Sequence, residues 1–215
     1  CYWGIYNNYP IFIYYRKLQS VVGGDSLIIN GAETFFAFRF NQENAKLYGI
    51  EFNLDIHPHP LDWLHIENTF SWVRGLLGRE QDGSRNLPFI PAALLISEIK
   101  IDLLKKGKTV RNVFIKAELD NTFGQNNPFT GFNTETATTG YSLLNAGFGG
   151  EVRSKEKILF NIFFGTINMG NVAYQNHLSR LKYGPGNMVT GRTGVFNMGR
   201  NFSVKFNIPL DFSGQ

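Results

Sequence analysis

Apolar and polar residues alternate along several segments of the chain, and this pattern predicts β-strands. It is most regular near the end of the sequence, where six apolar residues occupy every second position. They are Phe202, Val204, Phe206, Ile208, Leu210 and Phe212. The segment 48–56 follows the same rule, with Ile50, Phe52 and Leu54 between polar neighbours. Because a period of two places these side chains on one surface of a sheet, the sequence predicts an all-β chain.

We expect eight antiparallel strands joined by connections that alternate in length. The strands are expected at residues 2–16, 34–57, 62–75, 91–105, 110–124, 139–152, 157–167 and 196–212, with a bulge near Asn41–Asn44 in the second. Tight turns are expected at 57–61, 105–108 and 154–156, and long links at 17–33, 76–90, 125–138 and 168–195. Short turns at one rim and long loops at the other are typical of outer-membrane β-barrels.

A soluble antiparallel barrel is the simplest alternative, since it also has one apolar face. It predicts that the face formed by Phe202 to Phe212 points inward and that the chain stays monodisperse without detergent. The length of segments such as 110–124 argues against it. Strands of globular sheets have roughly five or six residues, whereas a strand that crosses a bilayer at a tilt needs about ten. Charged residues in mid-strand also suit the lumen of a membrane barrel.

Composition narrows the class of protein further. Aromatic residues make up 15% of the chain and charged residues 18%, below the usual quarter or so. No apolar run approaches the roughly 20 residues of a membrane-spanning helix. The single cysteine excludes an internal disulfide and a cysteine-based metal site. The net charge of +4 comes from scattered Lys and Arg, which argues against a nucleic-acid partner.

The first residues carry no secretory signal, because Cys1 opens directly into an apparent strand. If the protein is exported, its N-terminal part has therefore been removed or lies ahead of this sequence. A lipid-bearing Cys1, as in a lipoprotein, is the alternative. We disfavour it because no flexible tether follows the cysteine.

Several short segments, in order, resemble the last third of the barrel of a TonB-dependent receptor of the Bacteroidetes type. They are NAKLYGIE at 44–51, DIHP at 55–58, LPFIPA at 87–92, GYSLLN at 140–145, the link 168–183 and GRNF at 199–202. The resemblance spans essentially all 215 residues. It implies that residues 1–215 are the C-terminal portion of a 22-stranded barrel, here about eight strands. The N-terminal plug and the earlier strands would then lie outside this sequence.

The resemblance also implies a function, that of an active transporter in the outer membrane. Its surroundings would be lipid and lipopolysaccharide, and the TonB energy-coupling complex would act through the missing plug. The expected substrate is a scarce one, by default an iron complex such as a siderophore or haem, with copper or a glycan as alternatives. Glu51 would face the plug or the transport path. The sequence does not identify substrate-binding residues.

The closing strand has an expected role of its own. Apolar residues at alternate positions that end in an aromatic resemble the signal read by the outer-membrane assembly machinery, through strand addition. Phe212 would be the terminal aromatic, preceded by Phe202, Val204, Phe206, Ile208 and Leu210. Pro209 and the three residues after Phe212 depart from that pattern.

Other chemistry is not favoured. No catalytic elbow, phosphate loop or acid–base pair is recognisable, so we expect neither an enzyme nor a cofactor. His57 and His59 flank a proline in a turn, which explains them without a metal. His177, Met169 and Met188 offer soft ligands for copper but without ligand spacing, so we expect loop packing. A self-contained eight-stranded barrel that anchors or adheres, without transport, is the alternative function.

Overall fold

The computed structural model describes residues 2–14, 27–30, 33–36, 38–155 and 157–210. The strands are β1 (Tyr2–Tyr14), β2 (Leu27–Asn30), β3 (Glu33–Phe36), β4 (Phe38–Ile56), β5 (Leu64–Gln81), β6 (Ser84–Asn86), β7 (Leu94–Leu104), β8 (Val110–Thr122), β9 (Tyr141–Ser154), β10 (Lys157–Ile167) and β11 (Asn201–Asn207). Two short 3-10 helices are η1 (Gly131–Asn133) and η2 (Arg180–Tyr183). Neither is long or apolar enough to cross a membrane.

The main sheet confirms the predicted all-β, antiparallel architecture. Its hydrogen-bonded order is β1-β4-β5-β7-β8-β9-β10-β11, with β6 paired to β5. Every pair with a defined register is antiparallel. The chain divides into two compact units, and β4 and β5 contribute residues to both. Unit 1 comprises Cys1–Ile50, Trp72–Ala92 and Gln125–Thr138, and unit 2 comprises Glu51–Ser71, Ala93–Gly124 and Thr139–Gln215.

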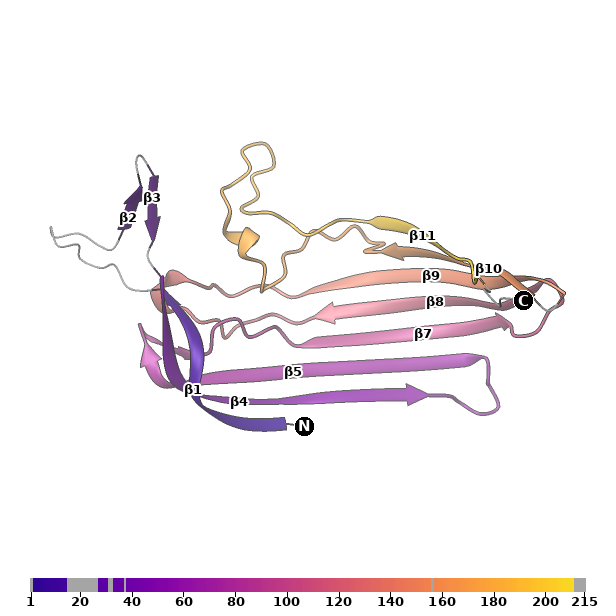
Figure 1. The fold of residues 1–215 in the computed structure, drawn as a ribbon, viewed down its shortest axis with the longest axis horizontal. Coiled ribbons are helices and arrows are strands. Elements are labelled where there is room, and N and C mark those ends of the chain that lie inside the picture. Colours follow the sequence, from indigo (N-terminus) through magenta and orange to yellow (C-terminus); the bar gives the residue numbers. More distant parts are fainter. Residues whose placement is uncertain (1, 15–26, 31–32, 37, 156, 211–215) are drawn as a thin grey trace, which may run out of the picture. The chain divides into compact units, whose positions relative to one another are not determined.

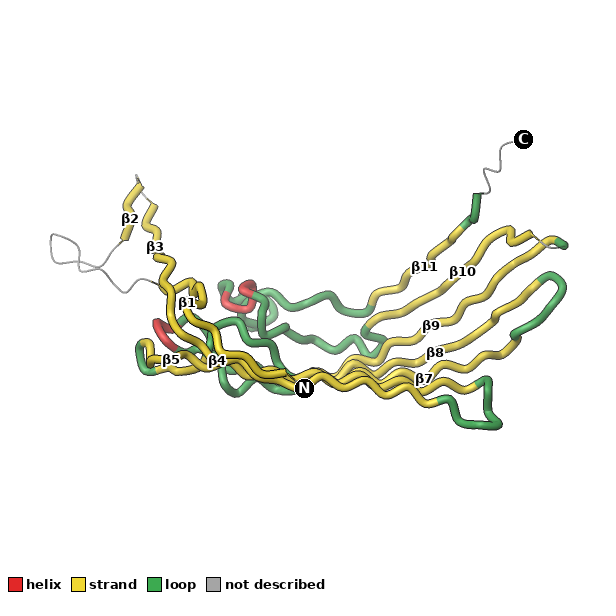
Figure 2. Tube along the Cα trace, turned by 60° about the horizontal axis from the view of Figure 1, so that its bottom comes forward, coloured by secondary structure: helices red, strands yellow, loops and turns green. Residues whose placement is uncertain are grey.

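Unit 2 consists mainly of long strands laid side by side, from β7 to β11 (Figures 1 and 2). Its three short connections, after β4, β7 and β9, lie at one end of these strands (Figure 1). The first contains Pro58 and Pro60, and the second contains Gly107, residues that favour tight turns. The link between β10 and β11 is long by contrast and leaves from the opposite end. Within this unit the short turns and the link between β10 and β11 lie at opposite ends of the strands, as the sequence predicted for these connections.

Unit 1 holds the buried apolar cluster of the described residues, made of Ala45, Leu77, Leu87 and Phe129. Gly75 is required beside it, because a Cβ there would meet the Cβ of Leu87 at 2.7 Å. Two links fold together around this cluster. The buried carboxylate of Glu135 accepts the backbone N–H of Phe89 (2.8 Å) and of Phe129 (3.0 Å). These two long connections of unit 1 are therefore packed together and hydrogen-bonded to each other.

Several predicted boundaries differ from the structure. The link expected at 76–90 is mostly strand, because β5 continues to Gln81 and turns at Asp82 and Gly83 into β6. The hairpin of β2 and β3 begins within the link expected at 17–33. The irregularity expected near Asn41–Asn44 lies in the opposite strand, where β1 has an extra residue between Tyr6 and Tyr9. β11 begins at Asn201 rather than at residue 196.

Candidate functional site

The cross-strand register of unit 2 sorts its side chains onto two faces. Glu98 lies opposite Glu118, and Lys100 lies opposite Lys116. The intervening residues, such as Ile99 opposite Ala117, point to the other side. We call the first side the polar face, defined by Glu98, Lys100, Lys116, Glu118, Asn145 and Lys205. We call the second the apolar face, defined by Ile99, Ile115, Leu119, Leu144, Phe148, Val204 and Phe206.

Charges on the polar face are arranged as a ladder. Like charges directly opposite one another on neighbouring strands destabilise a sheet. The ammonium group of Lys116 offsets this by lying 2.6 Å from Glu98 Oε2 and 4.0 Å from Glu118 Oε2. The Asn145 amide donates to Glu118 Oε1 at 2.8 Å. One lysine and one asparagine therefore stabilise two facing glutamates, and the polar face is a connected network.

A hollow of about 550 Å³ lies on this face. Its charged lining consists of Lys100, Lys116, Lys205, Glu98 and Glu151, beside the rings of Phe114 and Phe163. The two rings stack with centroids 6.2 Å apart. A Cβ at Gly147 would meet the Phe163 ring at 2.7 Å, so the glycine makes room for this aromatic wall.

The long link between β10 and β11 is fixed to the polar face through Asn168. This residue is fully buried, and its backbone N–H donates to Asn145 Oδ1 at 2.9 Å. Its side chain accepts from the N–H of Val172 (2.7 Å) and donates to the carbonyl of the same residue (2.8 Å). Further along the link, the ring of Tyr174 lies 4.3 Å from that of Tyr141. Burial raises the pKa of Tyr174, and nearby Tyr141 and Asp120 add to the effect.

The apolar face is exposed over its length. All seven of its side chains are aliphatic or aromatic, and each is more than 40% exposed. They are Ile99, Ile115, Leu119, Leu144, Phe148, Val204 and Phe206. Exposed apolar patches beyond a few hundred Å² mark membrane or protein contacts. Five residues of the expected assembly signal lie near the C-terminal end of the chain, and all five are exposed. They are Phe202, Val204, Phe206, Ile208 and Leu210. Ile208 and Leu210 follow the paired strand, and Phe212 lies outside the described residues.

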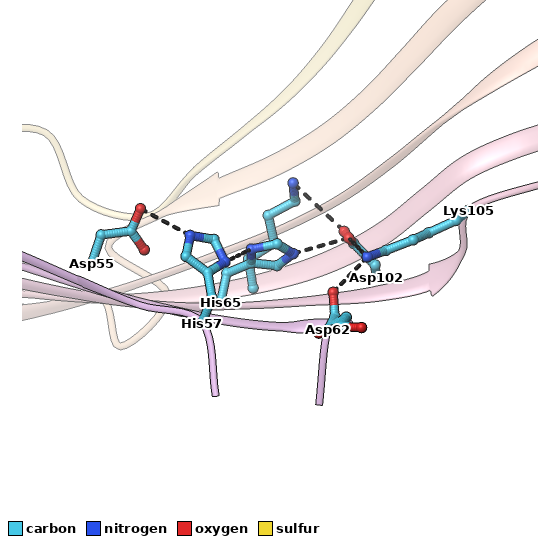
Figure 3. A network of polar contacts seen from close by, with 7 residues as sticks. Asp55, His57, Asp62, His65, Asp102 and Lys105 are labelled. Atoms are coloured by element: carbon cyan, nitrogen blue, oxygen red, sulfur yellow. Dashed lines mark hydrogen bonds and ion pairs between the residues drawn. The ribbon is translucent and has the colours of Figure 1, made fainter. Parts of the chain in front are cut away.

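A cluster of histidine, aspartate and lysine side chains lies where the short turns are (Figure 3). His57 Nδ1 lies 2.9 Å from His65 Nδ1. The Nε2 of His57 is 3.0 Å from Asp55, and the Nε2 of His65 is 2.9 Å from Asp102. Asp102 also pairs with Lys100 and Lys105, at 3.6 Å each. We call the four residues Asp55, His57, His65 and Asp102 the rim cluster.

Sequence reasoning considered His57 with His59, but the structure pairs His57 with His65. His59 instead faces Asp62, at 3.7 Å. One sequence signal for the contact between His57 and His65 was available: His65 lies at the start of the strand that follows the turn containing His57. Its pairing with Asp102 depends on the register between β5 and β7, which no local pattern supplies.

The soft-ligand candidates have different surroundings. His177 is buried and lies 3.4 Å from the Lys182 ammonium group. Met188 and Met169 are both exposed, and Met169 lies beside the end of β10. Within the described part of the chain, no three His, Cys, Asp or Glu residues are grouped as metal ligands.

Comparisons with known proteins identify the fold alone. No family model matches the chain, and no curated protein matches it. Among solved structures, the chain is similar to one described as copper transporter OprC, with a TM-score of 0.65 and 14% sequence identity. The similarity covers 96% of this chain and only 27% of the OprC chain. The described structure is thus a wall of antiparallel strands similar to part of a transporter several times its length.

Proposed function

We propose that this chain is part of the barrel wall of a TonB-dependent outer-membrane receptor, which imports a scarce substrate. The observation that carries the proposal is the division of unit 2 into an exposed apolar face and a charged opposite face with a hollow. Lipid suits the first face and an aqueous or plugged lumen suits the second. A soluble protein would leave the first face in contact with water.

Two further observations support this assignment. Short turns gather at one end of the unit 2 strands, as at the periplasmic rim of such barrels, and the long link leaves from the other. The similarity in fold to copper transporter OprC covers nearly all of this chain but about a quarter of that one. This ratio suits a chain that forms one sector of a larger barrel, with the plug and earlier strands elsewhere in the protein.

The expected substrate is an iron complex, such as a siderophore or haem, with copper or a glycan as alternatives. Uptake would be active: the TonB complex would act on a plug that rests against the polar face. The protein's remaining contacts would be outer-membrane lipid, lipopolysaccharide and the assembly machinery. The second candidate function is a self-contained barrel that anchors or adheres, favoured only by the ability of eight strands to close.

Energised uptake tests the proposal. Cells with and without the protein would be compared for accumulation of ⁵⁵Fe–siderophore, haem and ⁶⁴Cu, each with and without a protonophore. We expect one substrate to accumulate only in cells that have the protein, and the protonophore to abolish the difference. Equal accumulation of all three in both strains would contradict metal uptake. A protein-dependent difference that survives loss of the proton gradient would contradict energy coupling.

A further inference from the structure

The rim cluster has a proton arrangement that leaves two nitrogen lone pairs facing each other. A carboxylate can only accept a hydrogen bond, so the Nε2 atoms beside Asp55 and Asp102 are both donors. A neutral imidazole has one N–H, and here it is used at Nε2. Both Nδ1 atoms then present lone pairs to one another across 2.9 Å. That contact is repulsive unless a cation, either a proton on one Nδ1 or a metal ion, is shared between the two nitrogens.

We propose that His57 and His65 form a two-histidine binding site for a divalent transition-metal ion, with Cu²⁺ as the ion the geometry favours. Metal–imidazole bonds are about 2.0–2.1 Å long. Two nitrogens 2.9 Å apart can both reach that distance from one ion at roughly a right angle, the angle between neighbouring ligands in the square-planar or tetragonal sites of Cu²⁺. Tetrahedral Zn²⁺ would need a wider separation. Water would complete the coordination.

The surroundings of the pair support a metal. Histidine ligands commonly donate their other ring N–H to a carboxylate, which fixes the tautomer and increases ligand basicity. Both histidines have this partner, Asp55 for His57 and Asp102 for His65 (Figure 3). Asp55, His65 and Asp102 lie on three different strands, and His57 lies in the turn between the first two, so the fold brings these four residues together.

Charge and access are also compatible with a cation. Two carboxylates, Asp55 and Asp102, contact the pair, and the ammonium groups of Lys100 and Lys105 lie 3.6 Å from Asp102 (Figure 3). These four charges cancel, so a cation meets no net repulsion from them. The side chain of His57 is 55% exposed and that of His65 is 26% exposed, so an ion from solution can reach them.

The proposed metal site goes beyond the proposed transport function. It lies at the end of the unit 2 strands that carries the short turns, and metal binding there can be measured without transport. The test uses the full native protein, purified in detergent and stripped of metal with a chelator. Cu²⁺ is titrated by calorimetry, and its coordination is examined by electron paramagnetic resonance. The variants are His57→Gln and His65→Gln. His59→Gln is the matched control, since it removes an imidazole from the same turn that faces Asp62.

We expect one site in the native protein with hyperfine coupling to two nitrogens. Either His57→Gln or His65→Gln should weaken Cu²⁺ binding at least about 10-fold and reduce the coupling to one nitrogen, while His59→Gln leaves both unchanged. Asp55→Asn should weaken binding roughly 10-fold, because an uncharged amide oxygen is a weaker acceptor than the carboxylate for the His57 N–H. The heat-dependent gel mobility of folded barrels checks that each variant is folded. Absence of Cu²⁺ binding, or binding that both variants retain, would overturn the proposal whether or not uptake is observed.

Discussion

Lys116 is the residue on which the ladder of the polar face depends. Replacing it by Met keeps the length of the side chain and removes the charge between Glu98 and Glu118. We expect Lys116→Met to lower the free energy of unfolding by about 1 kcal/mol, because the groups are only partly buried. Urea unfolding of the protein in detergent measures this. In a double-mutant cycle, adding Glu98→Gln should recover part of the loss; additive effects would mean that the 2.6 Å contact contributes nothing.

At the scale of residues, the sequence predicted which face of the sheet a side chain occupies, but not which residue lies opposite it. Alternation of apolar and polar residues is enough to place Glu98 and Glu118 on polar faces, since the side-chain period of a strand is two. It did not place them opposite each other, and it did not bring His57 and His65 together. Partners across a sheet depend on register between segments far apart in sequence, such as His65 and Asp102, and local patterns do not contain it.

A single strand, β11, is enough to test which of the two faces points toward lipid. Spin labels would be attached to single cysteines at 202, 204 and 206, on the apolar face, and at 203 and 205, on the other, with native cysteines replaced. In lipid vesicles, labels on the apolar face should be relaxed mainly by dissolved oxygen, which concentrates in lipid. Labels at 203 and 205 should be relaxed mainly by a water-soluble nickel chelate.

The contrast between adjacent residues is the internal control of this experiment. Ser203 and Val204 share the same depth and differ only in face, since Ser203 lies opposite Gly165 and Val204 opposite Phe164. If positions 203 and 204 respond alike, β11 does not separate lipid from lumen. If oxygen relaxes 203 more than 204, the apolar face points inward and the soluble-barrel alternative is favoured.

At the scale of elements, strand existence was predictable and several strand ends were not. All eight expected strands are found, because long alternating segments leave few other structures. The missed continuation of β5 had a local signal, an Asp82-Gly83 pair with both residues at positive φ, a preferred hairpin turn. The packing of the neighbouring links had no such local signal in the sequence. It depends on the buried Glu135, whose partners Phe89 and Phe129 lie in different links.

At the scale of the whole molecule, the number of strands in the proposed barrel does not follow from local sequence patterns. Closure of a barrel links strand number, tilt and stagger across all of its strands. Among the described residues, β1 and β11 each have one hydrogen-bonded neighbour in the main sheet. A strand edge exposed to lipid leaves its backbone groups unsatisfied, at several kcal/mol each. Both strands therefore need further partners in a membrane.

The mass of the native polypeptide distinguishes the two ways of supplying those partners. This chain has a calculated mass of 24.4 kDa and matches 27% of the copper transporter OprC chain. If additional strands of the same polypeptide pair with β1 and β11, the protein purified from outer membranes should have an intact mass several times 24.4 kDa. A mass near 24.4 kDa would require β1 and β11 to pair with each other or with another chain. It would contradict the plugged transporter and favour a small anchoring barrel, because a polypeptide of that size has no residues left for a plug.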